Sequence, residues 1–201
     1  TTFAGMATLK NRDGDSDGMK TLLVSGHTDI ARSVANKAII DAILAERPDV
    51  EVDSLCDLYP DYDIDVAAEQ AKLCDADAII LQFPMFWYQM HSLLKRWFEQ
   101  VFVHGFSHGS TGDKLKGKKL VVSVTSGGPE NVYTREVLGF ELGDLMSSIR
   151  ATSNMCQMEF CGFVHSGGVS YQAHNDEGAR QALMDKLAGH AARVLELVDS
   201  N

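Results

Sequence analysis

The sequence has little of what secreted, membrane-spanning and metal-stabilised proteins depend on. Only four of its 201 residues are cysteine, none of them in a C-x-x-C pair or at zinc-finger spacing to histidine. No apolar run is long enough to span a bilayer, and no basic segment followed by an apolar stretch opens the chain. We therefore expect a cytoplasmic protein with free, buried thiols and no metal site.

Basic residues are also scarce. Lysine and arginine number 18 against 28 aspartates and glutamates, which gives a formal net charge of -10. Binding to the phosphates of nucleic acids depends on clustered lysine and arginine, so we expect no nucleic-acid partner. The basic residues that do cluster, at 114–119, lie beside glycines, and we expect a solvated loop before a strand there.

The first 18 residues differ in character from the rest. Residues 11–18 are polar and rich in glycine, and a clear apolar run opens at Met19. We expect residues 1–18 to be a disordered extension or an expression remnant, followed by a single domain over residues 19–201. Residues 13–18 resemble the start of a calcium loop. However, Val24 stands where that loop needs a bidentate carboxylate, so calcium is not expected.

The remainder of the chain alternates between strand and helix patterns. Short apolar or alternating runs predict strands at residues 21–25, 50–55, 78–83, 120–125 and 158–165. Apolar residues at helical spacing predict helices at residues 33–45, 66–73, 91–103, 138–151 and 176–198. Strands that alternate with helices form a parallel sheet covered on both faces. The predicted fold class is α/β, with a three-layer, doubly wound, five-stranded flavodoxin-like sheet in the order 2-1-3-4-5.

In such sheets, ligands bind beyond the carboxyl ends of the strands, where the winding direction switches. The loop after the first strand, residues 25–36, leads into a helix whose N-terminal N–H groups and dipole favour a phosphate. Ser33 could donate to phosphate oxygens, and His27 or Arg32 could supply charge. The loop has neither the P-loop nor the G-x-G-x-x-G pattern, and plain helix capping by Asp29 or Ser33 is an equally good interpretation.

The loop after the third strand, residues 84–90, holds three consecutive aromatic residues, Phe86, Trp87 and Tyr88. Core aromatics normally recur at alternating or helical spacing. This run therefore favours a flat apolar ligand such as an isoalloxazine ring. The alternative is that Phe86 and Trp87 anchor the helix that follows.

The loop after the fourth strand, residues 125–133, contains Gly127 and Gly128, which let the backbone turn sharply and approach a ligand. Their N–H groups could donate to a flavin carbonyl, and Tyr133 could donate to the ring or the substrate. An ordinary Gly-Pro turn is the alternative. All three loops are predicted to face one end of one sheet, and together they indicate a site for a flavin nucleotide.

Two histidines are spaced four residues apart, His104 and His108. This spacing suits metal binding on a helix, but Gly105 and Gly109 break such a helix and no third ligand is evident. We expect instead a loop near the rim of the site.

From Met19 to about Val198 the chain resembles the flavodoxin-2 family of NAD(P)H quinone oxidoreductases. Within it, the chain is most similar to the bacterial ancillary reductases of glutathione-gated potassium efflux and to general stress quinone reductases. The resemblance is carried by motifs in the right order along the domain: Ser25-Gly-His27, Ser33-x-x-Asn36, Ala76-Asp77, Gln82-Phe-Pro84, Trp87-Tyr88, Leu94-Lys95-x-Trp97, Val101-Phe102, Gly105, Ser126-Gly-Gly-Pro129 and Tyr133.

This resemblance implies a homodimer in which NAD(P)H and a quinone use one flavin pocket in turn, by a ping-pong mechanism. The flavin-binding residues it implies are His27, Ser33 and Ala35 on the phosphate side, Pro84, Met85, Phe86 and Trp87 against the ring, and Ser126, Gly127 and Gly128 at its other edge. Tyr133 is implied near the reactive side, as the catalytic residue. The segment between Leu58 and Val66 is short and leaves FMN or FAD open; we expect FMN, as in the bacterial relatives.

One departure and three alternatives follow from the resemblance. Vertebrate relatives place a histidine a few residues beyond the tyrosine, where this chain has Gly139. Tyr133 would then act alone or with water. The protein could instead be a regulatory subunit that docks on a membrane transporter, an electron carrier like flavodoxin, or a nitro- or azo-reductase. The sequence does not choose between NADH and NADPH.

Overall fold

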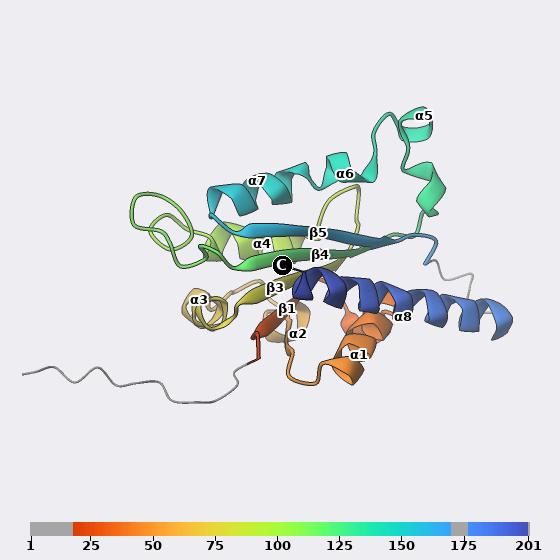
Figure 1. Ribbon diagram of the computed structural model, residues 1–201, viewed down its shortest axis with the longest axis horizontal. Coiled ribbons are helices and arrows are strands. Elements are labelled where there is room, and N and C mark those ends of the chain that lie inside the picture. Colours follow the sequence, from red (N-terminus) through yellow and green to blue (C-terminus); the bar gives the residue numbers. More distant parts are fainter. Residues whose placement is uncertain (1–17, 170–176, 201) are drawn as a thin grey trace, which may run out of the picture.

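The computed structural model describes residues 18–169 and 177–200, and five parallel strands form its centre (Figure 1). They are β1 (Thr21–Ser25), β2 (Glu51–Ser54), β3 (Ala78–Pro84), β4 (Lys119–Thr125) and β5 (Glu159–Ser166). Their order is β2-β1-β3-β4-β5, with every neighbouring pair parallel, so the predicted doubly wound sheet is confirmed. Nearly every side chain of β1, β3 and β4 is buried, because helices cover both faces of the sheet.

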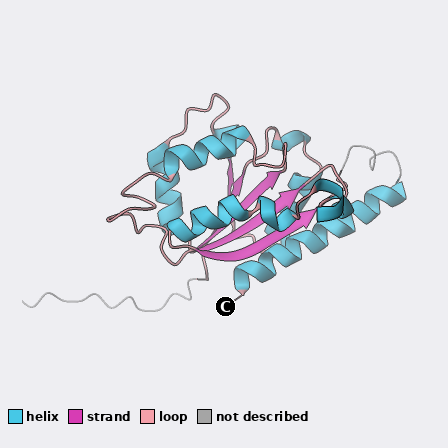
Figure 2. Ribbon diagram, turned by 90° about the horizontal axis from the view of Figure 1, so that it is seen from above, coloured by secondary structure: helices cyan, strands magenta, loops and turns pink. Residues whose placement is uncertain are grey.

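Two separate apolar clusters pack on the two faces of the sheet. On one face, α1 (Ala35–Glu46) and the long α8 (Glu177–Asp199) lie against β1, β3, β4 and β5, through residues such as Ile39 and Leu187. On the other lie α2 (Leu55–Leu58), α3 (Val66–Asp75), α4 (Ser92–Val101) and α7 (Ser147–Met155), with the fully buried Trp97 among them. Figure 2 shows α8 running along one side of the sheet.

The prediction of one helix over residues 138–151 was wrong. The chain forms three helices there: α5 (Arg135–Leu138), α6 (Leu142–Leu145) and α7. Gly139 ends α5 in the left-handed region at φ 79°, and a capping box of Glu141 and Asp144 starts α6. The apolar spacing continues across these breaks, so the pattern alone could not show them.

A buried polar cluster joins α3 to α4 beneath the sheet. Glu69 is fully buried and accepts hydrogen bonds from the Tyr59 hydroxyl and from Trp97 Nε1, both at 2.7 Å. Lys72 Nζ lies 2.6 Å from both Glu69 Oε1 and Asp53 Oδ1. A buried carboxylate with three donors is satisfied, so this cluster fixes α3 and α4 against the sheet.

Two further predictions concern the loop of His104 and His108 and the N-terminal residues 1–18. His104 and His108 lie in the loop after α4. Figure 1 shows this loop (green) at the end of the strands opposite to the end where α5 lies. This loop leads to the amino ends of the strands, so its predicted place near the rim of the site was wrong. The expected extension, residues 1–18, lies outside the described residues except for Gly18. No helix among the described residues is both long and apolar enough to cross a bilayer.

Candidate functional site

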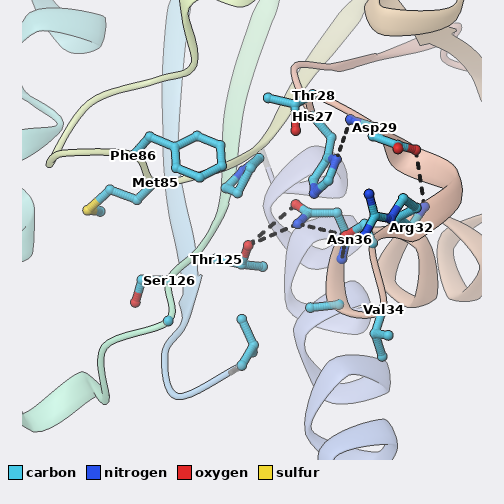
Figure 3. Close-up of a pocket in the computed structure, with 15 residues that line it drawn as sticks. His27, Thr28, Asp29, Arg32, Val34, Asn36, Met85, Phe86, Thr125 and Ser126 are labelled. Carbon is cyan, nitrogen blue, oxygen red and sulfur yellow. Dashed lines mark hydrogen bonds between the residues drawn. The ribbon is translucent and has the colours of Figure 1, made fainter. Parts of the chain in front are cut away.

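Two adjoining cavities open at the carboxyl ends of the strands. The first, of about 420 Å³, is lined from the loops after β1, β3 and β4, with Val169 after β5 (Figure 3). The second, of about 510 Å³, extends along the turns after β3 and β4 to Val137 and Leu138 of α5. Met85, Ser126 and Gly127 line both cavities, which therefore form one continuous site.

The β1 loop builds the polar end of the first cavity. After Gly26 it forms a short 3-10 helix, η1 (Ile30–Arg32), where Asp29 accepts a hydrogen bond from the Arg32 N–H at 3.3 Å. Ser33 Oγ accepts from the Asn36 N–H at 3.1 Å, at the start of α1. The predicted capping is thus present at both residues. The first N–H groups of α1 have no partner inside the helix, and they lie at the positive end of the helix dipole. Both properties favour the binding of an anion at this end of α1.

His27 is held in one tautomer at the edge of this loop. Its Nδ1 accepts a hydrogen bond from the Asp29 N–H at 2.9 Å, so the ring proton of the neutral side chain is on Nε2. Burial lowers the pKa of His27, and the nearby Asp29 carboxylate opposes that shift. His27 therefore presents a neutral N–H donor, and Arg32 carries the positive charge of the first cavity.

The aromatic turn after β3 has a strained backbone. Phe86 and Gln89 exchange two backbone hydrogen bonds of 2.9 Å, so Trp87 and Tyr88 are the central residues of a two-residue hairpin. Both have positive φ, 47° and 65°, a conformation that normally selects asparagine or glycine. Strain of this kind at large side chains is typical of ligand sites.

Trp87 does not anchor the helix that follows. Its side chain is 91% exposed beside the second cavity, which excludes that alternative for Trp87. Phe86 does contact His91 at the start of α4, with ring centroids 5.7 Å apart. Tyr88 packs edge-on against Phe140 at 5.4 Å. Phe86 and Tyr88 thus hold the turn in place on either side of Trp87, and the indole of Trp87 is free to contact a ligand.

The glycine turn after β4 holds Tyr133 over the backbone. A Cβ added at Gly128 would lie 3.2 Å from the Tyr133 hydroxyl, whereas one added at Gly127 would meet no atom within 4 Å. The backbone at Gly127 therefore borders open space. Glu130 ties this loop to α8 through Lys186 at 2.8 Å and accepts from the Gly167 N–H at 3.1 Å.

A histidine from β5 completes this side of the site. The ring of His165 lies 5.2 Å from that of Tyr133, nearly perpendicular to it, and His165 Nε2 is 2.8 Å from Ser126 Oγ. Ser126 donates its only hydroxyl proton to the Gly128 carbonyl at 2.9 Å, so His165 Nε2 must be the donor to Ser126. Burial lowers the pKa of His165, which favours the neutral ring. Tyr133 thus has a histidine neighbour, although Gly139 occupies the place expected from vertebrate relatives.

The structure brings all the predicted site residues to these two cavities. Eight line the first cavity: His27, Ser33, Ala35, Pro84, Met85, Phe86, Ser126 and Gly127. Trp87, Gly128 and Tyr133 line the second cavity, together with the shared Met85, Ser126 and Gly127. Sequence reasoning missed His165 and Val169. The end of β5 lies at the same edge of the sheet, so the rule that selected three loops could have selected this fourth one.

Comparisons with known proteins agree with this architecture. The family model Flavodoxin_2, described as a flavodoxin-like fold, matches residues 19–191. The NAD(P)H oxidoreductase YdeQ of Bacillus subtilis (strain 168) is 40% identical over 145 residues, which is 72% of this chain and 73% of that protein. The glutathione-regulated potassium-efflux system ancillary protein KefF of Enterobacter sp. (strain 638) is 39% identical over 140 residues, 69% of this chain and 78% of KefF.

Solved structures give the same result. General stress protein 14 of Treponema denticola in complex with FMN has a TM-score of 0.80 at 28% identity, covering 89% of this chain and 99% of that one. An NADPH-quinone reductase from P. pentosaceus has a TM-score of 0.71 at 27% identity, covering 86% and 98%. With its fold and these relatives in agreement, the chain belongs to the Flavodoxin_2 family, whose members similar to it include proteins named NAD(P)H oxidoreductase and NADPH-quinone reductase.

Proposed function

We propose that this protein binds FMN and transfers two electrons from NAD(P)H to quinones or similar acceptors, by a ping-pong mechanism in one pocket. The observation that carries the proposal is the continuous site described above. It has hydrogen-bond donors and a helix N-terminus at one end, and an exposed indole and an open glycine turn at the other. That sequence of surfaces matches the parts of a flavin mononucleotide, whose phosphate is charged and whose ring is flat.

The residues present fit this cofactor. Ser33, the first N–H groups of α1 and Arg32 would hold the phosphate, with His27 as a further donor. Pro84, Met85, Phe86 and Trp87 would contact the ring, and the open backbone at Gly127 would meet its polar rim. The complex of the Treponema relative with FMN supports FMN over FAD.

The flavin supplies hydride acceptance and donation when it is bound. This chain's own residues bind it, orient it and hold a proton donor beside it. Tyr133 Oη is the proposed donor to the ring or to the quinone oxygen. Its ring is held between Gly128 and His165, so the hydroxyl keeps one position above the glycine turn.

Replacement of Tyr133 by phenylalanine tests its proposed role. We expect kcat with NADPH and a quinone to fall about 10-fold or more, because a positioned proton donor contributes roughly 10²–10⁴-fold and water replaces it only in part. Tyr62→Phe is the matched control, since the Tyr62 hydroxyl bonds Ser92 and lines neither cavity. Full kcat with both substrates in the Tyr133 variant would show that the role is wrong.

Steady-state kinetics test the mechanism and separate it from the alternatives. Parallel lines in double-reciprocal plots, with NADPH varied at several quinone concentrations, are the expected result for ping-pong transfer. An electron carrier would show little oxidation of NAD(P)H. The homodimer, a regulatory contact with a membrane transporter and the location in the cytoplasm stay predictions. Co-purification with a transporter, and its activation by a variant without turnover, would favour the regulatory alternative.

A further inference from the structure

A chain of buried polar side chains runs from α8 across the sheet to the first cavity. All six of its members are at most 9% exposed, and they come from five strands or helices and the β1 loop: Ser166, His190, Ser123, Gln82, Asn36 and Ser33. His190, on α8, is fully buried beneath β4 and β5. Such residues are costly in an apolar layer unless each finds partners.

Every neighbouring pair in this chain is hydrogen-bonded. Ser166 Oγ lies 2.9 Å from His190 Nδ1, and His190 Nε2 lies 2.7 Å from Ser123 Oγ. Ser123 bonds Gln82 Oε1, its direct neighbour in the register of β3 and β4. Gln82 Nε2 then donates to Asn36 Oδ1 at 2.7 Å.

The chain ends at the wall of the first cavity, where Figure 3 shows Asn36 bonded to Thr125. The two protons of Asn36 Nδ2 have two acceptors, Thr125 Oγ1 at 3.1 Å and Ser33 Oγ at 3.3 Å. Ser33 Oγ also accepts from the Asn36 backbone N–H. Two donors therefore occupy the lone pairs of Ser33, and its own proton has no acceptor among these partners.

The orientation of the two amides, with Gln82 Nε2 donating to Asn36 Oδ1, gives the chain one direction. Ser123 has a single proton and donates it to Gln82, so His190 must donate to Ser123 from Nε2. A neutral imidazole that donates from Nε2 accepts at Nδ1, here from Ser166. In the opposite direction, His190 would carry its proton on Nδ1, and Ser33 would donate inward to Asn36. That arrangement would present a lone pair of Ser33 to any anion in the cavity.

We propose that His190 is a positioning residue that acts through this chain to direct the Ser33 hydroxyl proton into the first cavity, toward a phosphate oxygen of the flavin nucleotide. The phosphate as ligand rests on the proposed function; the direction of the chain does not. The consequence is selectivity: the protein prefers phosphorylated FMN to riboflavin partly because of a histidine in its core.

The direction is tested by NMR on protein labelled with ¹⁵N-histidine. We expect the neutral His190 to carry its proton on Nε2, both with and without FMN, with the signal assigned in the wild-type protein by nuclear Overhauser contacts to Ser123 and Ser166. A proton on Nδ1 would overturn the proposal. This measurement uses only the wild-type fold and no turnover, so it decides the matter even if a variant does not fold.

The effect on selectivity is tested by the ratio of riboflavin to FMN dissociation constants. Ser123→Ala cuts the chain and should lower this ratio about 5-fold, since a directed donor to an anion is worth more than an undirected one. Ser153→Ala is the matched control. Ser153 is equally buried, but it bonds the Met158 carbonyl outside the chain, and the ratio should stay within about 2-fold.

A double variant shows whether Ser33 is the end of the path. The double variant Ser33→Ala, Ser123→Ala should give the same ratio of riboflavin to FMN dissociation constants as Ser33→Ala alone. Once the Ser33 hydroxyl is absent, interrupting the hydrogen-bond chain at Ser123 has no further effect on phosphate binding. Additive losses, or equal effects of Ser123→Ala and Ser153→Ala, would overturn the proposal. Failure of the wild-type protein to bind either flavin would instead refute the proposed function, with the NMR result still deciding the direction of the chain.

Discussion

Trp87 should stabilise the complex with the cofactor while it destabilises the empty protein. Its indole is 91% exposed, so the apoprotein gains almost nothing from burying it. Its φ of 47° is a conformation that costs a side-chain-bearing residue about 1–2 kcal/mol. Replacement by glycine removes this strain and also gives the unfolded chain more freedom, which costs about 0.5–1 kcal/mol. The net expectation for Trp87→Gly is an apoprotein more stable by about 0.5–1 kcal/mol.

Flavin binding should change in the opposite direction. A covered tryptophan buries about 150–250 Å², so one face under a flat ring contributes roughly 100 Å². At about 25 cal/mol per Å² this is worth about 2.5 kcal/mol, and ordering the side chain removes about 0.5–1.5 kcal/mol of it. The FMN dissociation constant of Trp87→Gly should therefore rise about 5- to 30-fold.

The assays are thermal unfolding of the apoprotein and a fluorescence titration with FMN. For a domain of this length, the expected stabilisation raises Tm by about 1–4 °C. The other tryptophan is the control: Trp97 is fully buried and donates to Glu69, so Trp97→Phe should lower stability by about 1–3 kcal/mol and leave FMN affinity unchanged. A Trp87→Gly apoprotein that melts well below the wild type, or that binds FMN equally well, would refute the reasoning.

Three further changes test other parts of the structure. Glu69→Ala leaves Tyr59 and Trp97 without their acceptor and should destabilise the protein by about 3–5 kcal/mol in urea denaturation; a loss below about 1 kcal/mol would contradict the role of this cluster. Burial lowers the pKa of His190 to about 3 from its usual 6.5, so between these values the unfolded chain binds a proton that the folded chain does not. Stability should then fall by about 2 kcal/mol from pH 7 to pH 5, and this part of the fall should be absent in His190→Gln. Gly26→Ala places a Cβ 2.7 Å from Leu94 Cδ2 and should cost about 1–3 kcal/mol, measured by thermal unfolding, because Leu94 is fully buried and cannot move away.

The sheet and the position of the site could be predicted because they follow from local patterns. Buried parallel strands are continuous apolar runs, and the loops at their carboxyl ends carry the residues that are out of place in a core. The ends of the helix expected at 138–151 could not be predicted, because the positive φ of Gly139 does not interrupt the apolar spacing.

The partners in the buried hydrogen-bond chain between the sheet and its helices could not be predicted from local sequence patterns. His190 and Ser123 are 67 residues apart, and only the sheet order brings them together. A signal was present, since Gln82 and Ser123 are polar residues within apolar strands and buried polar groups are normally paired. The pattern indicates that partners exist but not which residues they are. His165 carries a different signal, because it ends the predicted strand 158–165 and so lies at the carboxyl edge of the sheet, where ligands bind.

The most direct test of the account is a titration of the purified protein with FMN, FAD and riboflavin, followed by visible absorption and mass analysis of the bound flavin. We expect a yellow protein that holds one FMN per chain, binds it more tightly than riboflavin, and releases FMN rather than FAD on denaturation. A colourless preparation that takes up neither FMN nor FAD would contradict the central claim.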